Sequence, residues 1–185
     1  RVLDLSLFLP GPHLTMMMAD HGAEVIKLEP PGEGEPNRHI GPREGDTTVY
    51  FRNTHRGKKS ISLNLKDPAA REALLRVADT ADVFVEAFRP GVVDRLGVGY
   101  QAVAARNPRI VYCSIAAFGQ TGPYAKRAGY DFMIQGLGGL MSLTGRPEGD
   151  EGAGPVKVGV ALTDILTGLY STVAILAALA HRDHD

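Results

Sequence analysis

The stretch VLDLSLFLPGPHLTMMMADHGAEVIKLE, residues Val2–Glu29, contains a strand pattern, a helix pattern and a second strand pattern. Val2–Phe8 predicts a buried strand, which the following PGP sequence interrupts. His13–Asp20 predicts a short helix that ends at a glycine, and Glu24–Glu29 predicts the second strand. Two strands joined through a helix pair in parallel, so this stretch predicts a βαβ unit.

The rest of the chain repeats this alternation, which predicts an α/β fold with a mainly parallel sheet flanked by helices, one domain or part of a larger one. The further predicted strands are Ser60–Leu65, Asp82–Ala87 and Arg109–Ile115. Helices are predicted from Asp67-Pro68 to Asp79 and over Gly91–Leu96, Gln101–Asn107 and Tyr130–Leu143. The last of these contains Gly136, Gly138 and Gly139, which suggest close backbone packing. The segments 30–48, 118–127 and 146–155 are predicted loops.

The final segment, Pro155–Arg182, is almost free of charge and predicts a helix that is apolar nearly all round and therefore buried. Its length would span a bilayer, but Asp164 and several Thr and Ser residues favour a soluble core. Asp164 lies in the first turn and shares a small, polar face with Thr167, Gly168 and Ser171. Locally, Asp164 is either a helix cap or a reactive group that a ligand approaches across this face.

Composition narrows the range of functions. Net charge is −1, with 44% hydrophobic and 22% charged residues, so nothing indicates binding to nucleic acid or to an anionic membrane. The single cysteine, Cys113, excludes an internal disulfide, fits a reducing compartment such as the cytoplasm, and is expected to be a buried structural thiol. The chain opens on Arg1 inside a strand pattern and ends on HRDHD after a helix, so we expect a longer natural chain.

Several common catalytic and binding motifs are missing. The sequence contains neither GxxxxGK[ST], nor GxGxxG after the first strand, nor GxSxG. His181 and His184 lie three residues apart but form no zinc pattern, and no metal site is predicted. Basic residues at 55–59, and Arg89, Arg95, Lys126 and Arg127, are either solvated surface or a phosphate site. Arg89 favours the phosphate site because it follows a strand, where ligands of parallel sheets bind.

Taken together, these stretches resemble the class III CoA-transferases, the formyl-CoA transferase and carnitine CoA-transferase group. The matching runs are VLDLS…PGP (Val2–Pro12), ADHGAEVIKLEPP (Ala19–Pro31), KKSISLNLKDPAAREAL (Lys58–Leu74), ADVFVEAFRPGVVDRLGVGY (Ala81–Tyr100), NPRIVYCSIAAFGQTGPY (Asn107–Tyr124), GYD (Gly129–Asp131) and TDILTG…AILAALAHR. They occur in collinear order over essentially the whole chain. The resemblance implies the Rossmann-like large domain of that fold.

The resemblance also implies a reaction, in which Asp164 is the nucleophile. It attacks an acyl-CoA thioester and becomes an aspartyl-CoA thioester by way of a mixed anhydride, and an acceptor carboxylate then reverses the exchange. The helix N-terminus would stabilise the ionised Asp164, and the Gly168 face would leave room for the thioester.

Contacts with coenzyme A carry over to matching positions. Leu9 and Pro10 correspond to backbone contacts, and Leu63, Asn64, Leu65 and Lys66 to the adenosine end. Ala87, Phe88 and Arg89 match a contact run at a strand end, and Arg95 matches a phosphate-binding arginine. Ala128 stands where some members have a lysine, for which Lys126 or Arg127 is the candidate substitute. Pro30 replaces an arginine of some members and loses that contact.

Two departures from the family pattern matter for function. The related α-methylacyl-CoA racemases carry a histidine where this chain has Tyr130, and a tyrosine with an ordinary pKa near 10 suits proton abstraction poorly. Transfer is therefore favoured over racemisation, with a non-catalytic CoA-binding fragment as a third hypothesis. Family members are also about twice as long and form interlocked homodimers, so the C-terminal small domain and a glycine-rich lid would be absent here. The chain alone is then expected to be inactive.

Overall fold

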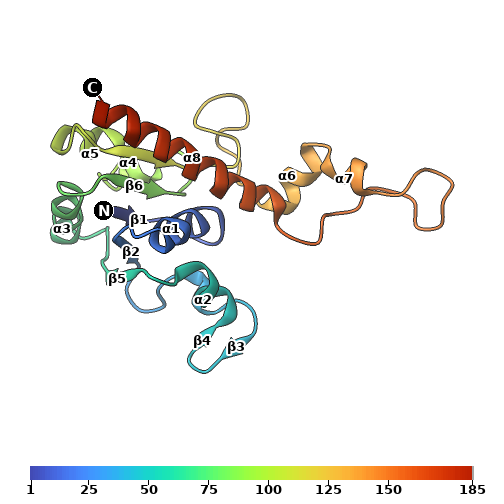
Figure 1. Cartoon of the computed structure of the whole chain (residues 1–185), viewed down its shortest axis with the longest axis horizontal. Helices are drawn as coiled ribbons and strands as arrows, with labels where there is room; N and C mark the ends of the chain where they lie inside the picture. Colours follow the sequence, from blue (N-terminus) through green and yellow to red (C-terminus); the bar gives the residue numbers. More distant parts are fainter. Residues whose placement is uncertain (185) are drawn as a thin grey trace.

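The computed structural model describes residues 1–184 and is built on a five-stranded, all-parallel sheet (Figure 1). Its strand order is β5-β2-β1-β6-β7. The strands are β1 Val2–Asp4, β2 Val25–Glu29, β5 Lys59–Ser62, β6 Val83–Glu86 and β7 Val111–Ser114. This confirms the predicted α/β fold with a parallel sheet. The first strand is shorter than predicted, since the chain turns into a loop well before Phe8.

Alternate residues of the central strands face two different helical layers. Leu3 of β1 and Phe84 of β6 belong to a core cluster with α3 (Pro68–Ala78), α4 (Val92–Arg95) and α5 (Tyr100–Arg106). Val2 and Val83 face the opposite way, into a cluster with α1 (Pro10–Asp20) and α8 (Leu162–His184). This period of two explains why strands buried on both faces read as continuous apolar runs.

The order of the strands creates a reversal point. From β1 the chain moves outward through β2 to β5, and then returns to the other side of β1 to add β6 and β7. The connections after β1 and β6 therefore leave the same end of the sheet in opposite directions. In open parallel sheets such a point forms a crevice that binds ligands.

Further elements form an arm and a small flap outside the sheet. The flap contains the 3-10 turn η1 (Pro36–Arg38), the hairpin of β3 (Arg43–Glu44) and β4 (Thr47–Thr48), and α2 (Val49–His55). The arm contains α6 (Asp131–Leu137) and α7 (Leu140–Thr144), which extend away from the sheet together with the loop that follows (Figure 1).

The prediction of one helix over Tyr130–Leu143 was wrong. Gly139 has φ of 80°, in the left-handed region, and separates α6 from α7. A side chain added at Gly136 would meet only Met141, at 3.7 Å, and one at Gly139 would meet nothing within 4 Å. Gly139 therefore provides a turn and Gly136 is uncrowded. At Gly138 an added Cβ would lie 3.0 Å from the carbonyl oxygen of Ile134, so close backbone contact is present at this one glycine of the three.

Helix α8 was correctly predicted as a long helix, but it is not buried. Gly168 and Ile175 are its buried residues, whereas Tyr170 is 75% exposed and Val173 is 64% exposed. One stripe of α8 packs on α1 and β7, and its first turn also contacts α6, whereas much of the rest of its surface is exposed among residues 1–184. By length and composition α8 is also a candidate to cross a membrane, which for a single helix is weak evidence.

Helices α1 and α8 meet at Gly168. A Cβ there would lie 2.9 Å from the carbonyl oxygen of Pro10 and 3.0 Å from the ring of His13. The small face predicted around Gly168 is therefore filled by the backbone of α1. It does not leave room for a thioester, which corrects the sequence-based interpretation.

Gly168→Ala is expected to destabilise the intact protein by about 1–3 kcal/mol, because the contacting backbone oxygen cannot move aside easily. Gly136→Ala, in the uncrowded helix α6, provides the control and should stabilise by up to about 1 kcal/mol through helix propensity. Urea unfolding of both variants checks this. Equal effects of the two substitutions would contradict the packing argument.

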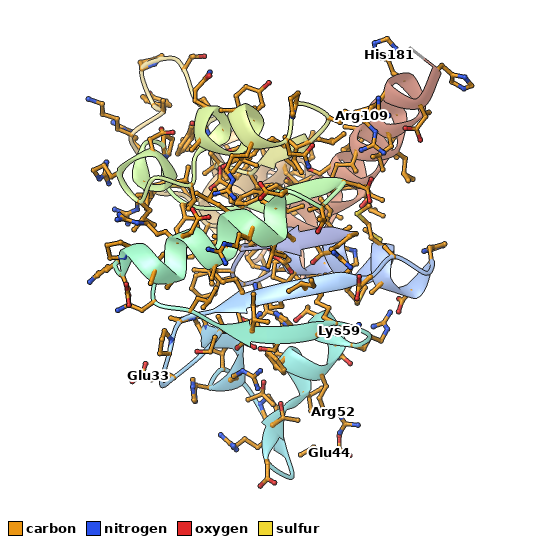
Figure 2. All side chains as sticks on the ribbon, turned by 90° about the vertical axis from the view of Figure 1, so that its left-hand side faces the viewer. Glu33, Glu44, Arg52, Lys59, Arg109 and His181 are labelled. Carbon is orange, nitrogen blue, oxygen red and sulfur yellow. The ribbon has the colours of Figure 1, made fainter. Side chains whose placement is uncertain are left out.

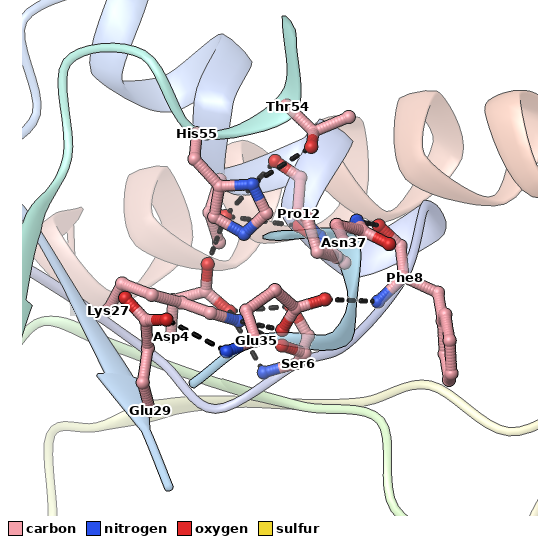
Figure 3. A network of polar contacts seen from close by, with 12 residues as sticks. Asp4, Ser6, Phe8, Pro12, Lys27, Glu29, Glu35, Asn37, Thr54 and His55 are labelled. Atoms are coloured by element: carbon pink, nitrogen blue, oxygen red, sulfur yellow. Dashed lines mark hydrogen bonds and ion pairs between the residues drawn. The ribbon is translucent and has the colours of Figure 1, made fainter. Parts of the chain in front are cut away.

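Charged side chains mainly cover the surface, as Figure 2 shows for Lys59, Arg109 and the pair Arg52 and Glu44. A second group is buried beneath α1. Lys58 and Lys27 have side chains 2% exposed, and both pair with Asp4, at 3.0 Å and 3.5 Å respectively. Figure 3 shows Lys27 and Asp4 within this buried network.

The stretch 55–59 is therefore not uniformly the solvated surface or phosphate site that the sequence suggested. His55 is buried, and burial lowers its pKa to about 3 with help from the positive charge of Lys58. Lys58 is committed to an internal ion pair with Asp4. Arg56 and Lys59 are exposed, and they form surface ion pairs with Asp20 and Glu24 respectively.

Candidate active site

A cavity of about 260 Å³ lies at the carboxyl ends of β1, β6 and β7, at the reversal point of the sheet. Its walls are the loops that follow these strands, the segment that leads into α6, and the first turn of α8. Segments far apart in the sequence therefore converge here because parallel strands end at one edge.

Half of the predicted site residues line this one cavity: Pro10, Ala87, Phe88, Arg89, Ala128 and Asp164. Arg127 also lines it and Lys126 does not, which favours Arg127 as the substitute for the lysine missing at 128. The guanidinium of Arg127 lies over the ring of Tyr124, 4.3 Å from its centroid.

The other predicted contact residues lie outside the cavity: Leu9, Leu63, Asn64, Leu65, Lys66 and Arg95. Leu65 is 8% exposed and belongs to the core, against which Leu63 also packs. Their side chains are thus occupied by packing, whereas Asn64, Lys66 and Arg95 are exposed. Their roles in binding stay predictions.

Asp164 does not cap its own helix. The cap comes from Asp131 of α6, whose Oδ1 accepts hydrogen bonds from the backbone N–H groups of Thr163 at 2.8 Å and Asp164 at 3.4 Å. The Thr163 hydroxyl donates to the same oxygen, and Gln135 donates to the other. No hydrogen bond or ion pair of the Asp164 carboxylate is found within residues 1–184, so it faces the cavity without a fixed partner.

The environment of Asp164 makes it a stronger base than an ordinary aspartate. Burial raises its pKa to about 6, and the negative charge of Asp131 adds to this. Burial and the charge of Asp131 therefore outweigh the stabilisation of the ionised form that was expected from the helix N-terminus. At neutral pH Asp164 remains mainly ionised while being poorly solvated, which suits a carboxylate nucleophile.

Sequence reasoning missed several residues around Asp164. Asp131 was seen only as part of the GYD match; it stands at the start of α6 but caps α8, a role that a local capping signal does not indicate. Phe8, predicted only as the end of a strand, lines the cavity, and its ring centroid lies 6.0 Å from that of Tyr130, the residue that the comparison with the racemases had already singled out. Burial raises the pKa of Tyr50 to about 12, and the charge of Asp164 contributes.

Glu86 is a further residue that no sequence signal distinguished from an ordinary strand end. Its side chain is buried at the end of β6 and accepts hydrogen bonds from the Ser114 hydroxyl and, at 2.8 Å, from the backbone N–H of Phe88. It therefore shapes the turn that carries Ala87, Phe88 and Arg89 into the cavity.

Two remaining sequence-based expectations concern sulfur and metal. Cys113 is half-buried under α8, and burial raises the pKa of its thiol, consistent with a packing role. Within the part of the chain that the structure describes, no three His, Cys, Asp or Glu side chains are grouped so as to hold a metal ion.

The family model "CoA-transferase family III" matches residues 1–185, and the chain therefore belongs to CoA-transferase family III. This confirms the resemblance drawn from the sequence. The fold agrees with that of a CAIB/BAIF family protein from Brucella suis, with a TM-score of 0.92 and 45% identity. The match covers 99% of this chain and 48% of that one.

Named relatives are CoA-transferases with small carboxylate substrates. Succinate–glutarate CoA-transferase of Agrobacterium fabrum is 45% identical over 188 residues, covering 98% of this chain and 46% of the relative. Acetyl-CoA:oxalate CoA-transferase of Acetobacter aceti is 45% identical over 183 residues, with 98% and 46% coverage. Succinyl-CoA:glutarate CoA-transferase of Mus musculus is 46% identical, with 98% and 41% coverage. The chain thus spans less than half the length of these relatives.

Proposed function

We propose that this chain is the CoA-binding, N-terminal domain of an acyl-CoA:carboxylate CoA-transferase, with Asp164 as its nucleophile. The observation that carries the proposal is the Asp164 carboxylate at the strand-end cavity, which has no partner among residues 1–184 because Asp131 caps the helix in its place. A carboxylate that only stabilised α8 would instead bond to the N–H groups that Asp131 takes.

The proposed reaction needs no net proton transfer. A carboxylate oxygen of Asp164 attacks the thioester carbonyl, the C–S bond breaks, and CoA thiolate leaves behind a mixed anhydride. The thiolate then attacks the Asp164 carbonyl, releasing the donor acid and forming aspartyl-CoA. The acceptor carboxylate attacks this thioester, and the returning thiolate takes the acceptor acyl group and regenerates Asp164.

The cavity accommodates the reacting end of the substrate rather than all of coenzyme A. Its volume of about 260 Å³ lies at the low end of ligand pockets, so the nucleotide end must extend outside it. Arg89 and Arg127 line the cavity, and exposed Arg95 lies near the turn after β6. We assign these guanidinium groups to phosphate or carboxylate groups of the substrates.

Short dicarboxylic acids are the proposed acceptors and donors. The relatives are named for succinate, glutarate and oxalate, and two arginines at the cavity suit a second carboxylate. We also propose a cytoplasmic homodimer of a longer chain. The exposed apolar side of α8 supports further packing, and a single half-buried cysteine fits a reducing compartment.

Trapping the covalent intermediate tests the proposal. The intact natural protein is incubated with succinyl-CoA and then treated with hydroxylamine or borohydride, followed by peptide mass mapping. The expected result is an adduct on Asp164 and CoA transfer to added glutarate or oxalate. CoA binding without transfer would support a non-catalytic domain, and exchange of an α-proton without an acceptor would support a racemase.

Asp131→Asn is expected to shift the acidic limb of the kcat/KM profile to lower pH. The amide oxygen can still cap α8, but the negative charge that helps to raise the pKa of Asp164 is gone. Because Asp164 must be ionised to attack, a lower pKa extends activity toward acid. Glu148→Gln removes an exposed loop charge as the control. If the acidic limb of the kcat/KM profile had the same apparent pKa in wild type and in Asp131→Asn, the proposed influence of Asp131 on Asp164 would be contradicted.

A further inference from the structure

Phe8 adopts a backbone conformation that residues other than glycine normally avoid. Its φ is 64°, and no other non-glycine residue within 1–184 has a positive φ. The left-handed conformation costs a residue with a Cβ roughly 1–2 kcal/mol. Such strain persists only where surrounding contacts impose it, and it concentrates at functional sites.

Two buried side chains hold both peptide groups of Phe8. The Glu35 carboxylate accepts a hydrogen bond from the Phe8 N–H at 2.8 Å, and the Asn37 side-chain amide donates one to the Phe8 carbonyl. Glu35 and Asn37 are both fully buried. Glu35 directly precedes the flap and Asn37 lies at its start, far along the chain from the loop that they hold.

The clasp of Glu35 and Asn37 is itself firmly anchored. Glu35 lies 3.3 Å from the ammonium of Lys27, and its backbone N–H donates to Glu29 at 2.8 Å. The Thr48 hydroxyl donates to the carbonyl of Asn37. Figure 3 shows this network on one side of Phe8, with the Phe8 side chain directed away from it.

The strained conformation directs Phe8 into the candidate active site. Its ring lines the cavity with Asp164 and meets Tyr130 edge-on. Two residues further on, the carbonyl of Pro10 lies against Gly168, about one turn along α8 from Asp164. The wall formed by the loop after β1 is thus fixed at Phe8 by the clasp and at Pro10 by α8.

We propose that Glu35 and Asn37 are positioning residues for CoA transfer: they hold Phe8 in the left-handed conformation and so fix the cavity wall beside Asp164. This inference rests on the proposed function. If either residue served folding alone, its loss would lower stability without a specific effect on turnover or on the conformation of Phe8.

The test compares Asn37→Ala with Thr15→Val in the intact protein. Thr15 is fully buried and donates a hydrogen bond to Asp4 in the same network, without contacting Phe8. Both variants lose a buried hydrogen bond and are expected to lose similar stability. Asn37→Ala should lower kcat/KM by about tenfold or more through misplacement of the wall, and Thr15→Val less than twofold. Equal losses of kcat/KM would overturn the proposal.

Phe8→Gly provides a second, independent arm. Glycine adopts positive φ without strain, so Asn37→Ala should have little additional effect on kcat/KM in the Phe8→Gly background. The same tenfold loss in both backgrounds would show that Asn37 does not act through Phe8, and would also overturn the proposal.

Structures of the variants separate this inference from the proposed function. In Asn37→Ala, residue 8 is expected to leave the left-handed region, whereas in Thr15→Val it should remain there. Absence of transfer in the wild-type protein would refute the proposed function. The clasp would then be judged on the φ of residue 8 and on coenzyme A affinity by calorimetry, and an unchanged φ and affinity in Asn37→Ala would refute it.

Discussion

Asp164→Asn abolishes CoA transfer by the intact protein, with an expected loss in kcat of about 10⁴-fold or more, and at the same time makes the folded state more stable. The loss is large because the carboxylate of Asp164 is the group that forms the covalent intermediate, and removal of a nucleophile has effects of this size or greater. The amide cannot replace it, since its nitrogen and oxygen are poor nucleophiles.

The gain in stability follows from the raised pKa of Asp164. Its folded value is about 6 against an ordinary 3.8, so the folded state binds the proton more tightly than the unfolded state. Ionisation of such a carboxyl therefore lowers the stability of the folded protein as the pH rises from about 4 to 6. Asparagine carries no charge and removes this penalty. After allowance for solvent screening, we expect the free energy of unfolding to rise by about 1–2 kcal/mol at pH 7.

Transfer assays and urea unfolding at pH 7 and pH 4 check both effects. The stability gain should shrink at pH 4, where wild-type Asp164 is protonated. Asp150→Asn, on an exposed loop, is the control and should change neither property. Retention of turnover by Asp164→Asn would refute the nucleophile, whatever the stability measurement gives.

Lys58→Met is expected to destabilise the protein by about 3–5 kcal/mol, whereas Lys59→Met, one residue away, should change stability by less than about 1 kcal/mol. The ammonium of Lys58 donates to Asp4 at 3.0 Å and to the carbonyl of Pro12 at 2.9 Å, and its side chain is only 2% exposed. Its loss leaves the buried carboxylate of Asp4 with one neighbouring ammonium group, that of Lys27, in place of two. Lys59 instead pairs with Glu24 on the surface, where its side chain is 71% exposed.

The pH dependence distinguishes this mechanism from a loss of packing. Burial alone would raise the pKa of Asp4, but Lys27 and Lys58 together lower it well below its usual range. A carboxyl whose pKa is lowered by folding stabilises the folded state at pH values above its unfolded-state pKa, which is near 3.8. This contribution is lost as the pH falls below that value toward the folded-state pKa. The stability difference between wild type and Lys58→Met should therefore narrow in acid. Equal effects at positions 58 and 59 would contradict the buried pair.

Much of the fold could be predicted because it depends on local periodicity. The run Val2–Glu29 alternates strand, helix and strand, and each pattern reflects which side of the chain must be buried. Asp67 and Pro68 marked a helix start correctly, since the Asp67 carboxylate accepts from the N–H of Ala69. Asp164 was also found from sequence, as the one acid within an apolar helix pattern.

Other features depended on partners that are distant in sequence. The helix of Asp164 appeared buried because its apolar residues surround it. Burial depends on what packs against each side, and α8 has α1 and β7 along one stripe and α6 at its first turn. The capping of α8 by Asp131 could not be read from residues 162–164, since the cap reaches across 33 positions.

The βαβ alternation, the family and the candidate nucleophile could be read from the amino-acid sequence, because they follow from neighbouring residues and collinear motifs. Three features became visible in the folded chain alone: Asp131 frees Asp164, Lys58 is internal while Lys59 is exposed, and Glu35 and Asn37 hold Phe8 at positive φ. Each of these depends on burial and on hydrogen bonds between segments that meet only when the parallel strands end at one edge, and no local pattern encodes such a meeting.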